Sequence, residues 1–343
     1  MSESDVTREG VKGARPGRDV PADDAAGHGR HRRRRGRGER SMVPEARFSS
    51  YYGKPVLKRP TWKSVDIAGY LYLGGLAGGS SLLAAGAQAT GRPALARTAK
   101  LGAAGAISAS LVALVHDLGR PARFVNMLRV FKPTSPMSVG SWLLAGYAPL
   151  TVVAAATDVA RRYRLLGAGA TAGAAVLGPA VATYTAVLIS DTAVPSWHEG
   201  YREMPFVFAG SGASAAAGLA LAFVPAEQAG PAHRMAVLAA GLEMGAFQLM
   251  KRRIGLAAEP FEQGDPGRLL RAAELLTAGG TALAAVAGRR RGGRALAVAA
   301  GLALLSGSAA LRFGVFHAGV ASAEDPKYTV VPQRERLRTA GTD

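Results

Sequence analysis

The segment "HDLGRPARFVNMLRVFKPTSPMSVGSW", residues 116–142, brings together two groups that can exchange protons. His116 and Asp117 stand where a long run of Ala, Gly, Leu and Val ends, and basic residues and three prolines follow them. An imidazole titrates near neutral pH, and a neighbouring carboxylate can relay its proton. The pattern therefore predicts acid–base chemistry at His116 and Asp117, at the end of an apolar segment.

Further hydrogen-bond and proton donors occur near the ends of other apolar runs. Asp66 begins one such run, and Tyr70 follows it by one helical turn, hence on the same helix face. Tyr184 offers another hydroxyl group. A quinone needs donors of this kind, because its carbonyl oxygens become hydroxyl groups on reduction. We expect these side chains and the His–Asp pair to form a quinone site at the level of the lipid headgroups.

The composition limits the other chemistry that this chain can perform. Its 343 residues include 42 Lys and Arg, 24 Asp and Glu, and no cysteine. Disulfides, thiolate-bound zinc and iron–sulfur clusters are therefore excluded within this chain. A haem held by two histidines at mid-membrane depth is also not expected, because none of the six histidines lies in the middle of an apolar run. A metal site formed by His116, Asp117 and His198 remains an alternative.

The first 60 residues form an Arg-rich segment that we expect to be disordered. The run "HGRHRRRRGRGER" is polar and basic throughout, and no apolar core of a secretory signal precedes it. Because a large hydrophobic body follows, we interpret these charges as a solvated or topogenic tail rather than a nucleic-acid site. We expect residues 61–320 to form the membrane domain and residues 321–343 an extended C-terminal tail.

Between these tails, eight apolar stretches approach the length of about 20 residues that a helix needs to cross a bilayer. The stretches are residues 67–89, 98–116, 139–158, 166–190, 206–224, 233–251, 270–288 and 295–316. They are rich in Gly and Ala, which allow transmembrane helices to pack closely. The sequence therefore predicts an all-α integral membrane protein with eight transmembrane helices in a bundle.

Most of the ionisable groups at the ends of these stretches share one membrane face. With eight crossings, both termini lie on the face that carries Asp66, His116, Asp117 and the segment "WHEGYREMP" at 197–205. Ionisable groups at the ends of membrane spans are often functional. Lys and Arg near the first span favour cytoplasmic termini in the plasma membrane. We therefore expect the functional site on the face that carries the termini.

Four stretches together resemble one known family. They are "GYLYLGGLAGGS" at 69–80, "HDLGRPARFVNML" through "SPMSVGSW" at 116–142, "YTAVLISDTAVPSW" at 184–197 and "MPFVFAGSGASAAAG" at 204–218. These segments resemble the membrane subunit of polysulfide reductase, the NrfD-like family. The terminal "GVASAEDPKYTVVPQRER" at 319–336 resembles actinobacterial members. The resemblance covers about residues 60–335.

This resemblance implies a quinone-reactive membrane anchor with no haem or iron–sulfur cluster of its own. It implies two partner subunits, a four-cluster ferredoxin-like iron–sulfur protein and a molybdopterin catalytic subunit, and menaquinone as the bound substrate. The quinone-binding positions of the family fall on Asp66, Tyr70 and Tyr184, and His116 and Asp117 match the end of the second span.

The remaining site residues follow from the same resemblance and from their charge. We expect docking of the iron–sulfur partner by a set of loop residues, namely Arg120, Arg123, Trp197, His198 and Glu199. Glu243, a carboxylate near mid-membrane, either serves a proton path or hydrogen-bonds a neighbouring helix.

Two other functions are compatible with an apolar helical bundle. A small-solute transporter would require a polar path at mid-membrane depth and broken helices in two corresponding halves. A purely structural anchor would bind partners without a polar pocket.

Overall fold

The computed structural model describes residues 6–7, 10–11, 56–120, 122–288 and 293–340. The Arg-rich run at 28–40 lies outside the described residues, so its predicted disorder stays a prediction. The chain divides into two compact units. One comprises Pro60–Ser322, and the other combines Met1–Arg59 with Ala323–Asp343.

The unit Pro60–Ser322 is built from long helices, as the apolar stretches predict. Its described residues contain eight helices of 20 residues or more: α1 (Ser64–Ala89), α2 (Pro93–Leu118), α4 (Pro136–Ala160), α5 (Arg164–Ser190), α7 (Met204–Phe223), α8 (Gly230–Ile254), α10 (Gly264–Ala287) and α11 (Arg294–Glu324). Seven of them are long and apolar enough to cross a membrane, and α8 is long enough but less apolar. The helical membrane architecture is thereby confirmed, and the eighth crossing is considered below.

Short helices connect the long ones at one end of the bundle. They are α3 (Ala122–Met127), α6 (Pro195–Glu199), the 3₁₀ helix η2 (Gly255–Ala258) and α9 (Glu259–Glu262). Proline begins several helices, because its missing N–H would be unpaired there in any case. Gly119 ends α2 with φ 72, a left-handed conformation that glycine adopts without steric cost.

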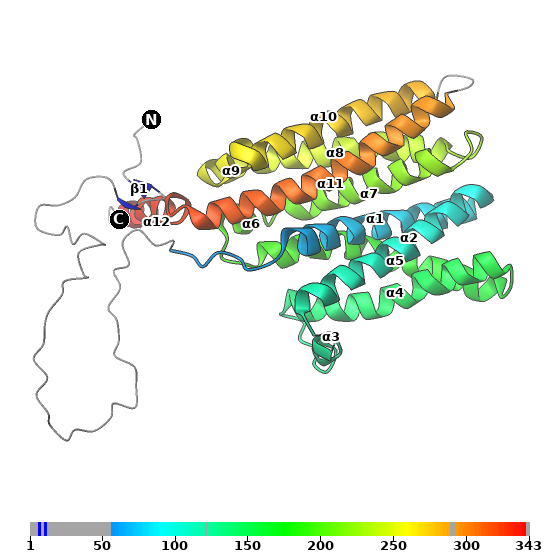
Figure 1. The fold of residues 1–343 in the computed structure, drawn as a ribbon, viewed down its shortest axis with the longest axis horizontal. Coiled ribbons are helices and arrows are strands. Elements are labelled where there is room, and N and C mark those ends of the chain that lie inside the picture. Colours follow the sequence, from blue (N-terminus) through cyan, green and yellow to red (C-terminus); the bar gives the residue numbers. More distant parts are fainter. Residues whose placement is uncertain (1–5, 8–9, 12–55, 121, 289–292, 341–343) are drawn as a thin grey trace, which may run out of the picture. The chain divides into compact units, whose positions relative to one another are not determined.

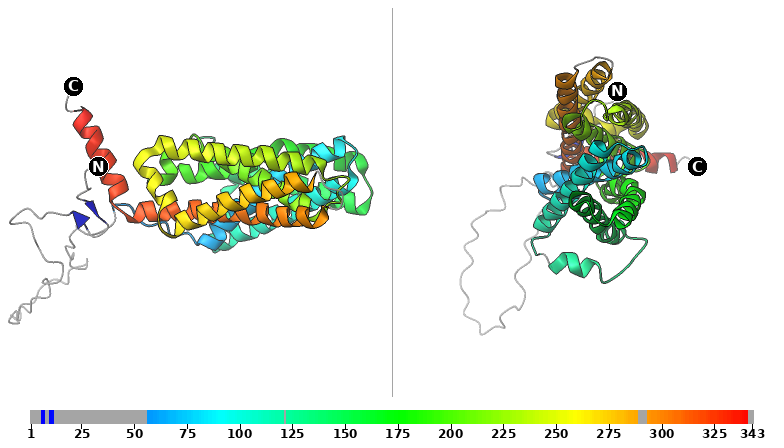
Figure 2. Two further views of the ribbon diagram at one scale, coloured as in Figure 1. Left: turned by 90° about the horizontal axis from the view of Figure 1, so that it is seen from above. Right: turned by 90° about the vertical axis from the view of Figure 1, so that its right-hand side faces the viewer.

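The long helices form two groups of four. Helices α1, α2, α4 and α5 lie together, and α7, α8, α10 and α11 form the other group (Figures 1 and 2). The two groups join where α1 packs against α7, and α1 also contacts α2 and α5. Helix α1 is therefore the central helix of the bundle, which explains why most of its residues are buried.

Pairs of glycines set the closest helix crossings. A Cβ on Gly78 of α1 would lie 2.3 Å from the carbonyl oxygen of Gly178 in α5. A Cβ on Gly301 of α11 would lie 2.4 Å from the carbonyl oxygen of Gly218 in α7. Small residues at a crossing let two backbones approach and gain van der Waals contact. The Gly-rich composition of the spans is therefore explained by packing.

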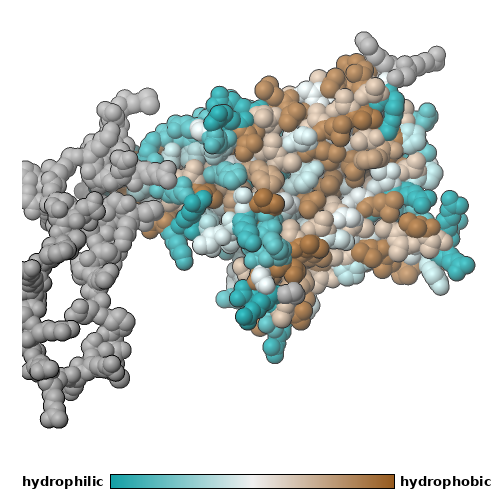
Figure 3. Space-filling model, in the orientation of Figure 1, coloured by the Kyte–Doolittle hydropathy of each residue, from teal (hydrophilic) through white to brown (hydrophobic). Residues whose placement is uncertain are grey.

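The sides of the bundle expose large apolar residues. Val112, Leu165, Val176, Leu238 and Leu275 are each more than half exposed. The space-filling view shows hydrophobic residues across the middle of the helices and hydrophilic residues toward their ends (Figure 3). Exposed apolar surface on this scale indicates a face that another apolar phase covers, here the bilayer.

The second unit corrects the prediction of an extended C-terminal tail. It contains strands β1 (Val6–Thr7) and β2 (Gly10–Val11), which pair antiparallel, and helix α12 (Lys327–Ala340). The backbone N–H of Lys327 donates to the Asp325 carboxylate at 2.9 Å. Asp325 therefore caps α12, and Pro326 follows it, a combination that favours a helix start. The sequence Asp325–Pro326 therefore starts a helix in a charged segment that composition alone would leave extended.

Candidate functional site

Asp66 and His116 form a hydrogen-bonded pair between α1 and α2. The imidazole Nδ1 of His116 donates to the Asp66 carboxylate at 2.8 Å. The Asp66 side chain is only 12% exposed, whereas that of His116 is 63% exposed. The first turn of α1 and the last turn of α2 meet at the same end of the bundle, which brings the two side chains together. The pair thus sets a largely shielded carboxylate behind an accessible imidazole.

The neighbouring Asp117 has a different partner from the one that its sequence position suggests. Its carboxylate accepts a hydrogen bond of 3.4 Å from the backbone N–H of Lys63, just before α1. Adjacent residues on a helix point about 100° apart, so His116 and Asp117 cannot face each other. His116 thus pairs with the carboxylate of Asp66 in α1, and not with that of the adjacent Asp117, as the sequence suggested.

Tyr70 and Tyr184 lie at similar depth on neighbouring helices. Tyr70 is in the second turn of α1 and Tyr184 in the penultimate turn of α5. Each is therefore about 10 Å inside the end that carries Asp66, given a rise of about 1.5 Å per residue. Tyr70 is 2% exposed, and the ring of Tyr184 packs on Gly140 of α4, where a Cβ would lie 2.3 Å from it. Both tyrosines thus lie toward the Asp66 end of the bundle, and among the described residues no hydrogen bond joins either of them to Asp66 or His116.

The predicted docking arginines follow α2, with Arg120 directly after its end and Arg123 in the short helix α3. Arg120 and Arg123 are both exposed, and the Arg123 guanidinium donates to the carbonyl of Leu118 at 2.7 Å. Arg123 therefore satisfies one of the carbonyls that remain unpaired at the end of α2. Its charge still faces solvent at the end that carries His116.

The three predicted docking residues of α6 behave differently from one another. His198 is exposed, and its Nδ1 donates to the carbonyl of Ser190 at 3.1 Å. The carbonyl of Glu199 accepts a hydrogen bond from the Arg253 guanidinium at 2.6 Å. Trp197, however, is fully buried. A side chain without exposed surface cannot contact a partner subunit, so the expectation that Trp197 docks one is wrong.

Trp197 instead packs α6 against α11. Its indole N–H donates to the carbonyl of Val315 at 2.8 Å, and its ring stacks on Trp62 at a centroid distance of 6.1 Å. Gly319 leaves the space for the indole, because a Cβ there would lie 1.9 Å from the ring.

An ion pair closes the same end of the bundle. The guanidinium of Arg253, in the last turn of α8, donates two hydrogen bonds of 2.6 Å to the Glu203 carboxylate, just before α7. Hydrogen bonds from Arg253 hold the pKa of the Glu203 carboxyl below its usual range. The carboxylate is therefore charged at neutral pH, and the pair ties the start of α7 to the end of α8.

Glu243 lies in a separate, buried polar cluster. It is 2% exposed, and its carboxylate accepts a hydrogen bond of 3.1 Å from the Thr277 hydroxyl of α10. Nearby, the hydroxyls of Ser211 and Ser308 are 2.8 Å apart. One Glu243 oxygen, Oε2, has no hydrogen-bond partner within the described part of the chain. The cluster is thus capable of taking up a further hydrogen bond or a proton.

The same region contains a cation that the sequence reading did not single out. Arg312 of α11 is fully buried, donates to the carbonyl of Phe208 at 2.7 Å and lies 3.6 Å from the centroid of the Phe208 ring. Gly75 of α1 provides space, since a Cβ there would lie 2.9 Å from the guanidinium. The available signal was a lone arginine inside the apolar run "SAALRFGVF".

The sequence of the chain matches one protein family over more than half of its length. The model of the family described as polysulphide reductase, NrfD, matches residues 57–265. The chain belongs to the polysulphide reductase NrfD family. No curated protein matches it. The resemblance inferred from the sequence motifs is confirmed, and with its seven apolar helices this NrfD protein is a multi-pass membrane protein.

The matched segment contains nearly all of the residues discussed above. It extends from the approach to α1 to the start of α10 and includes Asp66, His116, Tyr184 and Glu243, whereas Arg312 follows it. NrfD membrane subunits belong to oxidoreductase complexes and interact with quinones. Among the described residues, no group of three or more His, Asp or Glu side chains is arranged to hold a metal ion.

The residues at the α1–α2 end fit a quinone. A quinone carbonyl needs a donor that can also exchange a proton, and the accessible imidazole backed by Asp66 is such a group. Two cavities lie elsewhere. One of about 670 Å³ is at the opposite end of α1 and α2, and one of about 520 Å³ lies between α4 and α5.

Proposed function

We propose that this NrfD protein is the quinone-reactive anchor of a molybdopterin and iron–sulfur oxidoreductase complex. In this complex it exchanges electrons and protons between menaquinone or menaquinol and a four-cluster ferredoxin-like iron–sulfur subunit. The molybdopterin subunit carries the catalytic reaction that supplies or consumes the electrons. The family membership and the membrane helices support this assignment. The observation that carries it is the Asp66–His116 pair at a helix end.

The quinone head would lie between α1, α2 and α5. At one oxygen of the ring, Tyr70 would donate to the quinone carbonyl or the Asp66 carboxylate would accept from the quinol hydroxyl, and His116 or Tyr184 would hydrogen-bond the other oxygen. Contacts of α1 with both α2 and α5 support this arrangement, as does the similar depth of the two tyrosines. In such a site the chain's own side chains orient the substrate, and tunnelling from the partner's nearest cluster supplies or removes the electrons.

The Asp66–His116 hydrogen bond determines how protons would move. Nδ1 of His116 carries the proton that is donated to Asp66, so Nε2 of the neutral ring is an acceptor. A neutral His116 can therefore take a proton from a quinol hydroxyl, and a protonated His116 can give one to a quinone carbonyl. Quinone reduction takes up two electrons and two protons, and quinol oxidation releases the same number. Asp117 points away from the imidazole and lies beside the solvent-facing loop, so it would relay protons to and from His116 through intervening water.

We further propose that charged and polar residues at this end dock the iron–sulfur subunit. They lie at the same end of the bundle as His116, either directly after α2 or in the short helices α3 and α6: the exposed Arg120, Arg123 and His198 and the half-buried Glu199. Docking there brings the partner's cluster close to the quinone head, which short-range electron tunnelling requires. Trp197 is left out of this set because it is buried.

Glu243 is proposed as a group on a proton path through the second helix group. Its unpartnered oxygen, and the hydroxyls of Thr277, Ser211 and Ser308 around it, support this role. Replacing Glu243 with Gln should leave quinone-coupled electron transfer intact and lower the number of protons moved per electron in sealed vesicles. An unchanged ratio of protons to electrons would contradict the role.

We propose that α8 is the eighth membrane crossing and that both termini are cytoplasmic. Helix α8 contains 25 residues, about 38 Å of helix, which exceeds the hydrocarbon thickness of a bilayer. It packs along both α7 and α10, which are apolar enough to cross. Its lower apolarity is compatible with a position between other helices, where polar groups such as Glu243 face protein.

The proposed quinone role is tested by separating two activities of the intact complex. Replacing His116 with Gln, or Asp66 with Asn, should abolish turnover with menaquinone and leave turnover with an artificial dye near the wild-type rate. Asp191→Asn is the matched control, because Asp191 is an exposed carboxylate at the end of α5. Full quinone activity in both site variants would rule out the proposed site, and equal loss of both activities would indicate a structural role.

A further inference from the structure

A cavity of about 670 Å³ opens at the end of the bundle opposite to Asp66 and His116. It lies where α1 and α4 end and where α2 and α5 begin. Ligand pockets in proteins typically measure about 300–1,000 Å³. The walls of this cavity combine charged side chains with apolar ones, such as Ala96, Leu165 and Ala168. A cavity of this size and mixed lining suits an amphipathic ligand.

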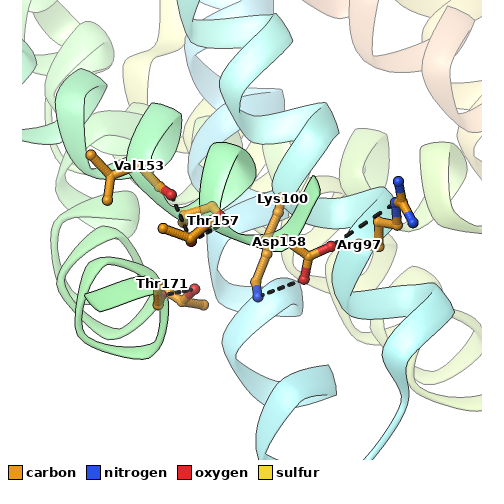
Figure 4. Close-up of polar contacts among 8 residues, drawn as sticks. Arg97, Lys100, Val153, Thr157, Asp158 and Thr171 are labelled. Carbon is orange, nitrogen blue, oxygen red and sulfur yellow. Dashed lines mark hydrogen bonds and ion pairs between the residues drawn. The ribbon is translucent and has the colours of Figure 1, made fainter. Parts of the chain in front are cut away.

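The only carboxylate among the lining residues is already paired. Asp158 of α4 lies 3.1 Å from the ammonium group of Lys100 and 4.0 Å from the guanidinium of Arg97, both on α2. Figure 4 shows Lys100 and Arg97 pointing toward Asp158 from α2. Lys100 is only 8% exposed, so this ion pair is largely withdrawn from solvent. The charge of Asp158 is therefore not available to balance other cations.

Three further cations line the cavity. They are Arg92, Arg161 and Arg164, and no carboxylate of the described residues forms an ion pair with them. Three guanidinium groups around one cavity attract an anion, and arginine binds phosphate through two parallel hydrogen bonds. The cavity is therefore complementary to a phosphate group.

The turn between α4 and α5 holds two of these arginines beside the cavity. Arg161 and Tyr163 adopt positive φ values of 53° and 56°. A residue with a side chain pays about 1–2 kcal/mol for this left-handed conformation. The two left-handed residues make the turn tight, so Arg161 and Arg164 line the same cavity. Backbone strain of this kind is often retained at binding sites.

An apolar groove continues from this cavity along the side of the bundle. It measures about 520 Å³, runs between α4 and α5, and includes Pro149, Leu150, Leu166 and Gly169 in its lining. Leu165 lines both the groove and the charged cavity. Because Leu165 is 90% exposed and Leu166 59% exposed, the groove opens toward the acyl chains of the bilayer.

We propose that the chain binds one anionic phospholipid at this place. Arg92, Arg161 and Arg164 hold its phosphate, and one acyl chain lies in the groove between α4 and α5. A quinone head is uncharged, so it leaves the three guanidinium groups without a counter-charge. A soluble anion leaves the adjoining groove empty. Only a ligand with an anionic head and an apolar tail matches both halves of the site.

The first experiment tests binding of the lipid headgroup by the arginines. The full-length chain and its accompanying subunits are purified in detergent and supplied with equal amounts of phosphatidylglycerol and phosphatidylcholine. Native mass spectrometry counts the retained lipids. The double variant Arg161→Gln/Arg164→Gln should retain about tenfold less phosphatidylglycerol than the wild type. The double variant Arg162→Gln/Arg234→Gln is the matched control, because it removes two exposed charges that do not line the cavity. It should retain phosphatidylglycerol within about twofold of the wild type.

The acyl half is tested by filling the groove. Gly169 lines the groove and a Cβ there meets no atom within 4 Å, so Gly169→Leu adds its side chain at an open position of the groove. This variant should lose phosphatidylglycerol to a similar extent as the arginine double variant. Gly105→Leu, at another open and exposed position on α2, should not.

Three results would overturn the proposal. The first is that all variants retain the same amount of lipid, and the second is that the wild type retains phosphatidylcholine as strongly as phosphatidylglycerol. The third is that inorganic phosphate raises the thermal stability of the protein as much as phosphatidylglycerol does. Loss of bound menaquinone in the Gly169→Leu variant, with phosphatidylglycerol unchanged, would assign the groove to the quinone instead. The lipid measurement is independent of quinone turnover, so the two proposals can fail separately.

Discussion

Asp66 fixes the tautomer of His116, because Nδ1 must carry the proton that it donates to the carboxylate. The residue types of this pair were readable from the sequence, but their partnership was not. Spacing along the chain suggested Asp117 as the partner of His116. Only the packing of α1 against α2 brings Asp66, which is 50 positions away, within hydrogen-bonding distance.

Arg312 and Trp197 mark two further limits of reading single residues. Arg312 stands among strongly apolar residues, so its sequence position does not reveal a partner. Its burial depends on the space left by Gly75 of another helix. Trp197 belongs to a polar, loop-like segment, which suggested a docking surface. Its burial depends on Gly319 and Val315 of α11, more than a hundred positions later in the chain.

Replacing Trp197 with Phe tests its structural role. The change removes the indole N–H that donates to the Val315 carbonyl and leaves space where the larger buried ring packed, so we expect a loss of about 1–3 kcal/mol in stability. Thermal unfolding of the purified protein measures this effect. The amount of iron–sulfur subunit that copurifies at low temperature should stay unchanged.

Trp142→Phe is the control, because Trp142 is 44% exposed. Loss of the partner subunit from the Trp197→Phe protein, with unfolding unchanged, would restore the docking interpretation.

At the scale of the helices, the closest crossings depend on glycine. Replacing Gly78 with Ala introduces a Cβ that would lie 2.3 Å from the Gly178 carbonyl oxygen, so α1 and α5 must separate. We expect a loss of about 1–3 kcal/mol from this overpacking. The variant Gly86→Ala on the same helix has open space around the new Cβ and should be neutral or slightly stabilised.

The unfolding midpoints of these two alanine variants in detergent provide the comparison. A Gly78→Ala protein as stable as the Gly86→Ala protein would contradict the proposed close contact between α1 and α5.

The Glu203–Arg253 pair predicts a dependence of stability on pH. Because the pKa of Glu203 is lowered in the folded protein, the pair stabilises the fold above the usual carboxyl pKa of about 4.3. This stabilisation is lost as the pH falls through the lowered pKa. Glu203→Gln should therefore reduce the free energy of unfolding by about 1–3 kcal/mol at pH 7. The difference from the wild type should shrink as the pH falls below about 4.

Unfolding midpoints measured between pH 7 and pH 3 test this expectation. Glu262→Gln is the control, since the Glu262 side chain is 59% exposed in its pair with Lys251. A difference between the Glu203→Gln protein and the wild type that stays constant over this pH range would exclude a role for the Glu203 charge.

For the whole molecule, the apolar stretches predicted the helices well and their ends less well. The second predicted span begins at residue 98, but α2 begins at Pro93, and the seventh begins at 270, but α10 begins at Gly264. An apolar window omits the polar turns at the membrane surface, although those turns continue the helix. The grouping of the helices into two sets of four depends on lateral contacts, such as Gly78 with Gly178, which no single span specifies.

The number of crossings can be tested because the natural chain contains no cysteine. We introduce single cysteines as Arg129→Cys, after α2, and as Glu227→Cys, between α7 and α8. This first pair is the control: α4, α5 and α7 separate the two positions, so a membrane-impermeant thiol reagent should label them from opposite sides of the membrane whether or not α8 crosses. A second pair, Glu227→Cys and Glu259→Cys, brackets α8 itself and should also label from opposite sides. If both cysteines of the second pair are labelled from the same side, α8 does not cross the membrane and the protein has seven crossings.

The central claim is that a quinone binds at the end of the bundle formed by Asp66, His116 and the nearby tyrosines. Photolabelling of the intact complex in membranes with an azido-menaquinone analogue, followed by peptide mapping, tests it most directly. We predict label in peptides from residues 64–72, 112–118 or 180–190, and loss of this label when menaquinone is added in excess. Label confined to residues 88–100 and 157–168, at the opposite end, would contradict the account.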